Sequence, residues 1–159
     1  MTTQEHPNTI GGMTRKTARL WIVLGLASAT CGCSSIRPPA NVKPVQRVLT
    51  TTAYCDCGKC CGWKRNWYGR PVVAGGPMKG HPKKVGLTAS GSKARQGTIA
   101  ADTSFFPFGT VMYIEGYGYG RVEDRGGAIK GDRLDLFFET HKRALEWGRR
   151  TVPVMIWLR

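Results

Sequence analysis

Residues 120–138 read GRVEDRGGAIKGDRLDLFF, and the end of this stretch alternates polar and apolar residues as a half-buried β-strand does. In such a strand Leu134 and Leu136 fall on one face, and Asp135 falls on the other. A carboxylate among bulky apolar neighbours is costly unless it is paired, hydrogen-bonded or functional. The stretch therefore predicts a core strand that carries a candidate functional acid.

Further segments rich in Val, Thr, Ile and Tyr predict short strands elsewhere in the chain. The predicted set comprises residues 47–54, 98–101, 110–115, 119–124, 133–138 and 152–158. Pro153 favours a later start or an edge position for the last strand, because proline cannot donate to a sheet. Residues 140–147 predict one short helix, with Thr140 as N-cap and Gly148 as its end. Six short strands with glycine-rich turns favour a mainly β fold, a small closed barrel rather than a sandwich.

The N-terminal part of the chain has the pattern of an export signal. Arg15, Lys16 and Arg19 precede the apolar run 20–29, which is too short to span a bilayer. We assign residues 1–33 to an export or lipoprotein-type signal, with a buried helix as the alternative. The exact cleavage site stays open.

Cys31 and Cys33 resemble the lipid-accepting cysteine of bacterial lipoproteins. Cysteine parity favours Cys33, because its lipidation leaves an even number of cysteines. Residues 34–45 are proline-containing and predict a tether, and residues 46–159 predict the folded domain with an inserted loop at 62–86. We expect an exported protein of the periplasm or cell envelope, with lipid attachment at the outer membrane as one outcome.

The chain is strongly basic, with 24 Lys and Arg against 10 Asp and Glu and a formal charge of +14. Residues 1–30 hold only three bases and one acid, so the remainder keeps a charge of +12. Such a charge favours an anionic polymer as partner, although a solvated basic surface is the simpler alternative. An exported chain meets wall polymers first, so we expect no nucleic-acid partner. We expect a monomer.

The inserted loop 62–86 carries aromatic residues among basic ones. Trp63, Trp67 and Tyr68 stand beside Lys and Arg side chains, and such rings can stack on sugars. A lid that packs its aromatic rings on the barrel explains the same pattern equally well. If the rings bind glycan, replacing Trp63 and Trp67 by Ala weakens binding without unfolding the domain.

Cys55, Cys57, Cys60 and Cys61 form a C-x-C-x2-C-C cluster directly after the first predicted strand. An oxidising compartment favours disulfides. Four thiolates can instead bind zinc in a tetrahedron, but the adjacent Cys60 and Cys61 project in different directions. Reduced or redox-active thiols are the third alternative. Disulfides are the preferred interpretation, and their connectivity cannot be read from the sequence.

Acidic residues are few, and Asp102, Asp124 and Asp135 lie at the ends or in the middle of predicted strands. A partly buried carboxyl keeps its proton to higher pH and can donate it to a leaving glycosidic oxygen. Simpler roles are a turn cap for Asp102, an Asx-type turn for Asp124, and an ion pair of Asp135 with Arg133.

Several motifs together resemble the 3D (three-aspartate) domain of bacterial wall proteins. The similarity is close over residues 86–158, and Thr52-Ala53-Tyr54 of the first strand adds to it. The matching segments read GLTASG (86–91), GTIAAD (97–102), FGT (108–110), IEGYG (114–118), VEDRGGAIKG (122–131), RLDLF (133–137) and ALEWG (144–148).

This resemblance implies a six-stranded double-psi β-barrel similar to the catalytic barrel of the membrane-bound lytic transglycosylase A family. It implies that Asp135 is the acid and base, that Asp124 and Asp102 assist, and that Thr88, Ser90 and Lys130 contact substrate. The implied reaction cleaves the MurNAc-GlcNAc β-1,4 bond of peptidoglycan, forms a 1,6-anhydro product, and needs no metal or cofactor. A hydrolytic muramidase would leave a reducing end instead.

The sequence departs from that pattern in its cysteine cluster, its 62–86 loop and its lack of the accessory domain of those transglycosylases. A non-catalytic peptidoglycan-binding module, similar to expansin-type barrels, is the alternative function.

Overall fold

The computed structural model describes residues 36–159. The expected export signal at 1–33, with Cys31 and Cys33, lies outside these residues. Within the described part, no helix has both the length and the apolar character that a membrane crossing requires.

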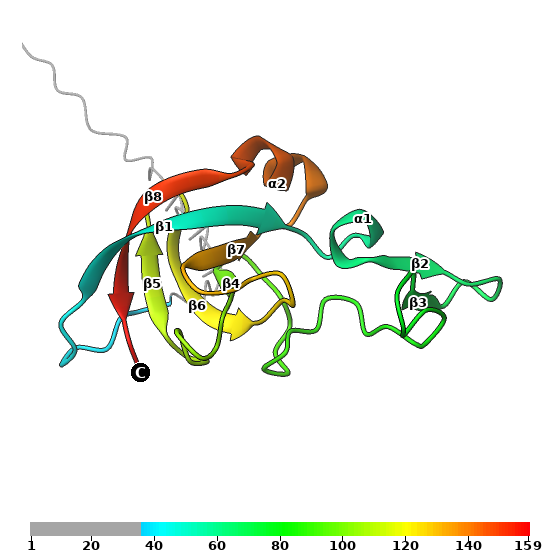
Figure 1. Cartoon of the computed structure of the whole chain (residues 1–159), viewed down its shortest axis with the longest axis horizontal. Coiled ribbons are helices and arrows are strands. Elements are labelled where there is room, and N and C mark those ends of the chain that lie inside the picture. Colours follow the sequence, from blue (N-terminus) through cyan, green and yellow to red (C-terminus); the bar gives the residue numbers. More distant parts are fainter. Residues whose placement is uncertain (1–35) are drawn as a thin grey trace, which may run out of the picture. The chain divides into compact units, whose positions relative to one another are not determined.

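Six strands form a closed barrel in the order β1-β7-β4-β6-β5-β8 (Figure 1). Parallel pairing joins β1 to β7 and β4 to β6, and the remaining neighbours are antiparallel. The predicted mainly β, six-stranded barrel is confirmed, and its two parallel pairs fit the expected double-psi type. The strands are β1 (Val45–Tyr54), β4 (Thr98–Ala101), β5 (Val111–Ile114), β6 (Gly118–Asp124), β7 (Arg133–Phe137) and β8 (Arg150–Trp157).

The barrel is filled by the inward-facing apolar side chains of all six strands. On β7, Leu134 and Leu136 are fully buried, whereas Asp135 on the opposite face is only half-buried, as strand alternation predicts. Other fully or almost fully buried members of the core are Leu49, Ile99, Met112, Ile114, Val122, Val154 and Ile156. The outward face of β7 is thereby free to line a site.

Both short helices lie beside the end of β1. The predicted helix is confirmed as α2 (His141–Trp147), with the Thr140 hydroxyl accepting a hydrogen bond from the Arg143 backbone N–H at 3.3 Å. A second helix, α1 (Gly58–Cys61), lies inside the cysteine cluster. The sequence did not predict it, because a single turn is too short to show helical periodicity.

Pro153 lies inside β8, which begins at Arg150, so the expected later start is wrong, whereas an edge position is met locally. The reason is the uneven pairing of β8. Its residues 150–153 pair with β1 alone, and pairing with β5 begins at Val154. The missing N–H of Pro153 therefore costs no ladder hydrogen bond on the β5 side.

The inserted loop contains a two-stranded hairpin, β2 (Trp63–Arg65) and β3 (Pro71–Val73), which projects from the barrel (Figure 1). The Asn66 side chain closes its turn by accepting hydrogen bonds from the Tyr68 and Arg70 backbone N–H groups. The hairpin is thus a separate arm with its own hydrogen bonds. The hairpin is therefore not the lid, with aromatic rings packed on the barrel, that was the alternative interpretation of the sequence.

Candidate functional site

A cleft of about 310 Å³ opens beside the carboxyl ends of β1 and β6 and the middle of β7. Two of the three predicted acids, Asp124 and Asp135, line it. Tyr54 of β1 lines it as well, and the basic residues on its wall are Lys83, Lys84 and Arg125. Its size is at the lower end of the range of small-molecule sites.

Asp135 is positioned by the parallel pairing of β1 with β7, which sets it opposite Thr52. The Thr52 hydroxyl donates a hydrogen bond of 2.7 Å to Asp135 Oδ1. Burial raises the pKa of Asp135, the Thr52 hydrogen bond partly opposes this, and the charge of Asp124 adds to the rise. The alternative of an ion pair with Arg133 is not met, because the Arg133 guanidinium donates to the Ala128 carbonyl instead.

Asp124 ends β6 and receives three hydrogen bonds. The Tyr54 hydroxyl donates to Oδ2 at 3.1 Å, and the backbone N–H groups of Ala89 and Arg125 donate to Oδ1 at 2.9 Å each. Burial, followed by the charge of Asp124, raises the pKa of Tyr54 far above its ordinary value, so this phenol stays a donor. Asp124 both organises its turn and presents a fixed carboxylate beside Asp135.

Asp102 does not line the cleft. It borders an adjacent cavity of about 340 Å³ together with Lys130, and Arg125 and Gly126 contribute to both cavities. Its carboxylate accepts from the Ser104 hydroxyl at 2.6 Å and from the Gly131 N–H at 3.1 Å. These hydrogen bonds, with that of Ser104 first, lower the pKa of Asp102. Asp102 therefore caps the turn at Ser104, the simpler role that the sequence suggested for it.

Thr88 and Ser90, expected at the substrate, lie in a turn beside the cleft and do not line it. The Thr88 side chain is buried, and its hydroxyl is within 3.0 Å of the Ser90 hydroxyl and within 2.9 Å of the Ser92 hydroxyl. This turn carries the Ala89 N–H that holds Asp124. The turn that holds both residues therefore contacts Asp124 through its backbone, not through the two hydroxyl groups.

Trp63 and Trp67 belong to the hairpin and also do not line the cleft. Trp63 is tied to the base of the arm, because its indole N–H donates to the Asp56 carbonyl at 2.7 Å. Trp67 is 82% exposed and its ring contacts that of Tyr68, with centroids 3.2 Å apart and the planes tilted by 35°. An exposed aromatic pair on a projecting arm is available to stack on a sugar.

Replacing Trp67 by Ala is expected to weaken binding to insoluble peptidoglycan several-fold without changing the melting temperature, because the ring supports no core contact. Pull-down against sacculi measures the first and thermal melting the second. Leu145→Ala, another exposed apolar truncation at 68% exposure, is the matched control. Equal binding of the Trp67→Ala variant and the wild type would exclude the arm from glycan recognition.

Sequence reasoning missed Thr52 and Tyr54 as site residues. Both lie on β1 two positions apart, so they share a face and reach Asp135 and Asp124 respectively. The signal was present in the matched Thr52-Ala53-Tyr54 motif, but only the strand register shows which acid each residue contacts. Lys83 and Lys84 were also missed, since a loop lysine has no sequence mark that separates it from the general basic surface.

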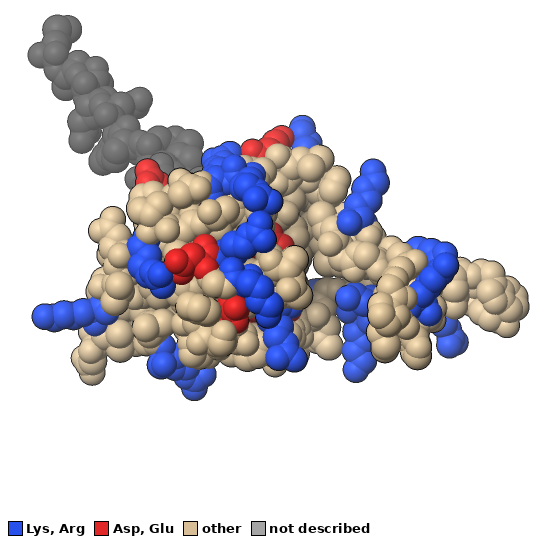
Figure 2. Space-filling model, viewed as in Figure 1, with Lys and Arg blue, Asp and Glu red and all other residues tan. Residues whose placement is uncertain are grey.

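Basic side chains extend beyond the cleft. Figure 2 shows Lys and Arg over this face of the barrel and on the projecting arm, with Asp and Glu side chains among those on the barrel. The strong positive charge of the sequence is therefore spread over this face of the barrel and over the arm. It is suited to a polymer that carries carboxylates.

Three of the four residues of the cysteine cluster lie together, and the fourth, Cys61, lies apart from them. The structure contains free thiols at all four described cysteines, so the expected disulfides are not met there. Cys55, Cys57 and Cys60 gather around the His141 ring, which sequence reasoning missed. Cys61 points elsewhere, donating to the Cys55 carbonyl at 3.1 Å and lining the cleft. Burial raises the pKa of Cys61 to about 11, which makes it a poor nucleophile at neutral pH.

Comparison with known proteins identifies the part of the chain that holds the three acids. Residues 97–158 match the family model of the 3D domain, which confirms the resemblance inferred from the motifs. Two curated proteins of Bacillus subtilis (strain 168) are each 39% identical over 75 residues, 45% of this chain. They are YabE, whose name refers to cell wall shaping, and the cell wall-binding protein YocH. The matched region is 18% of the first and 26% of the second, a minor part of either relative.

Among solved structures, MltA from E. coli is 22% identical over 46% of this chain and 28% of its own, with a TM-score of 0.37. The structure of E. coli MltA with bound chitohexaose is 23% identical over 44% of this chain and 27% of its own, with a TM-score of 0.38.

Proposed function

We propose that this chain, whose residues 97–158 match the 3D domain, is a lytic transglycosylase that cleaves the MurNAc-GlcNAc β-1,4 bond of peptidoglycan. The cell wall names of YabE and YocH support a wall polymer as substrate. The basic surface supports it too, because peptidoglycan carries muramyl and peptide carboxylates.

The observation that carries the proposal is the environment of Asp135. Its carboxyl is half-buried at a cleft, touches the Thr52 hydroxyl, and lies beside the negative charge of Asp124. Burial and that charge both raise its pKa, so the acid keeps its proton to a higher pH than an exposed aspartate does. A protonated carboxyl facing a cleft is what general acid catalysis at a glycosidic oxygen needs.

The reaction uses Asp135 twice. The protonated carboxyl gives its proton to the bridging oxygen, and the bond from C1 of MurNAc to that oxygen breaks, its electron pair leaving with GlcNAc. The resulting Asp135 carboxylate then accepts the proton of the MurNAc 6-hydroxyl. As that proton leaves, the oxygen of the 6-hydroxyl forms the new bond to C1. The product is a 1,6-anhydro sugar, no water is consumed, and Asp135 returns to its protonated form.

Asp124 supports this cycle as a positioning residue. Its carboxylate, fixed by Tyr54, Ala89 and Arg125, keeps the proton on Asp135 and faces the positive charge that develops at C1. Lys83 and Lys84 supply ammonium groups at the cleft wall for substrate carboxylates. The neighbouring cavity with Asp102 and Lys130 extends the same surface, so these two residues serve substrate orientation.

Digestion of purified sacculi with the wild-type protein tests the proposal. Mass spectrometry of the soluble products is expected to find 1,6-anhydromuropeptides. Products with reducing ends at MurNAc would instead assign a hydrolytic muramidase. Absence of any soluble muropeptide, with binding to sacculi retained, would assign the second candidate function.

That second candidate is a non-catalytic peptidoglycan-binding module. The name of YocH, a cell wall-binding protein, and the exposed Trp67–Tyr68 pair favour it. For either function we propose a monomer in the cell envelope that meets no nucleic acid. The export signal at 1–33, with attachment to the outer membrane through lipid on Cys33, belongs to the same proposal.

The pH dependence of cleavage follows from the groups around Asp135. Activity needs the protonated acid, so it falls as pH rises through the pKa of Asp135. Asp124→Asn removes a charge that raises this pKa, and the alkaline limb of the rate profile is expected to move to lower pH. Thr52→Val removes a hydrogen bond that lowers it, and the limb is expected to move to higher pH. Profiles of anhydromuropeptide release measure both, and shifts of the same sign would contradict the assignment of Asp135.

A further inference from the structure

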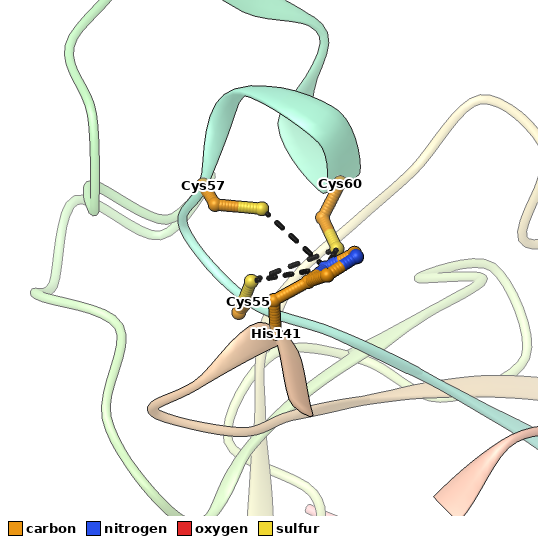
Figure 3. Close-up of side chains that lie close together, drawn as sticks. All are labelled: Cys55, Cys57, Cys60 and His141. Atoms are coloured by element: carbon orange, nitrogen blue, oxygen red, sulfur yellow. Dashed lines mark hydrogen bonds between the residues drawn. The ribbon is translucent and has the colours of Figure 1, made fainter. Parts of the chain in front are cut away.

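Four side chains from three separate elements converge beside the barrel (Figure 3). Cys55 directly follows β1, Cys57 is the N-cap of α1, Cys60 lies within α1, and His141 opens α2. Their sulfur and nitrogen atoms all lie within 4.8 Å of one another. None of the four has a part in the glycan chemistry proposed above.

The spacing of these atoms matches the edges of a metal-centred tetrahedron. Zinc lies about 2.3 Å from thiolate sulfur and about 2.1 Å from imidazole nitrogen, so a tetrahedron has S–S edges of about 3.8 Å and S–N edges of about 3.6 Å. The Cys55 and Cys60 sulfurs are 3.6 Å apart. His141 Nδ1 lies 3.9, 3.6 and 3.3 Å from the sulfurs of Cys55, Cys57 and Cys60. We propose that Cys55, Cys57, Cys60 and His141 bind one zinc ion.

The ligand set favours zinc over the alternatives. Three thiolates and one imidazole in tetrahedral array are typical of structural Zn²⁺ sites, whereas harder cations prefer oxygen ligands. A disulfide between Cys55 and Cys60 uses two of the three sulfurs and gives the His141 ring no role. A site made of four cysteines would require Cys61. The Cys61 thiol instead points away from the other three sulfurs and donates to the Cys55 carbonyl.

The barrel itself brings the ligands together. The parallel pairing of β1 with β7 holds to the end of β1, since the N–H of Phe138, just past β7, donates to the Tyr54 carbonyl at 2.8 Å. The chain segments that follow, with Cys55 on one side and His141 on the other, therefore start side by side. The hydrogen bond from the Cys61 N–H to the Cys57 carbonyl at 2.9 Å closes the turn of α1, and this turn presents Cys57 and Cys60 to the same point (Figure 3).

The ion would be structural and would shape the candidate active site. Four protein ligands leave it no open position for a substrate or water. Cys60 and Cys61 both line the cleft with Asp124 and Asp135, and the projecting arm begins at Trp63 just beyond α1. Zinc at this point fastens one cleft wall and the base of the arm to the barrel.

The test uses the full chain, reduced and then exposed to Zn²⁺ before gel filtration. Elemental analysis is expected to find one zinc ion per wild-type chain. Co²⁺ in its place is expected to give the visible bands of a tetrahedral site and a thiolate-to-cobalt charge-transfer band. His141→Ala and Cys57→Ser are expected to lose the metal at a chelator concentration that leaves the wild type loaded. Cys61→Ser is the matched control, because it alters the adjacent cysteine that is not one of the four proposed ligands. This variant is expected to retain the metal.

Two results would overturn the site. One is a reduced wild-type chain that takes up no stoichiometric zinc and shows no tetrahedral cobalt spectrum. The other is a Cys61→Ser variant that loses metal as readily as His141→Ala does. The cobalt spectrum of the wild type decides the matter even if the ligand variants fail to fold, and neither readout depends on glycan cleavage.

Discussion

Asp135→Asn is expected to reduce the release of anhydromuropeptides from sacculi by at least about 100-fold, the usual contribution of a general acid. The amide keeps the size of the side chain, and its oxygen can still accept the Thr52 hydrogen bond seen at 2.7 Å. It has no proton to donate to the bridging oxygen and cannot take one from the 6-hydroxyl. Both halves of the proposed cycle are therefore lost together.

The same variant is expected to melt at or above the wild-type temperature at neutral pH. Burial raises the pKa of folded Asp135 above that of the unfolded chain. Its contribution to stability is then fully present below the unfolded pKa and is lost as pH rises through the folded pKa, where a charge must be buried. A neutral Asn carries no such cost at pH 7. Thermal melting separates this loss of activity from unfolding.

Asp132→Asn is the matched control for this substitution. Asp132 lies just before the same strand, but it is exposed and pairs with Arg47 at 2.8 Å outside the cleft. Its removal is expected to change stability by about 1 kcal/mol or less and to leave cleavage intact. Retained cleavage by Asp135→Asn would show that another group, Asp124 first, is the acid.

How far the sequence predicts this molecule depends on the range of the interactions involved. The six strands were predictable because alternation and β-branched content are local signals, and Asp135 stood out as an acid in an apolar strand. The contacts of that acid were not predictable. Thr52 and Asp135 meet only because β1 pairs in parallel with β7, and no local pattern gives that register.

The cysteine cluster shows the same limit more sharply. The spacing of Cys55, Cys57 and Cys60 was visible, but the fourth member of the group is 81 residues further along at His141. The sequence indicated that the adjacent Cys60 and Cys61 project in different directions, but it did not indicate which of them joins Cys55, Cys57 and His141. The choice between a metal site and disulfides depends on where the cysteine side chains point and on the distant His141. Residue type alone does not decide it.

Leu136→Ala is expected to cost about 2 to 5 kcal/mol of unfolding free energy, the usual result of truncating a fully buried leucine. Leu136 is next to the proposed acid but faces the barrel core with no exposed surface. It is paired with Ala53 on β1 and with Ile99 on β4, so three strands border the cavity that the substitution would leave. Such a closed barrel has little freedom to collapse around the missing atoms.

Urea or thermal unfolding of the variant measures this cost, and a fall in melting temperature on the order of 10 °C is expected for a domain of this size. Leu145→Ala on the exposed face of α2 makes the same chemical change and is expected to alter stability by about 0.5 kcal/mol or less. A Leu136→Ala variant as stable as Leu145→Ala would mean that β7 does not turn this face to the core. Asp135 would then face inward, and its assignment to the cleft would fail with it, because neighbouring residues of one strand cannot share a face.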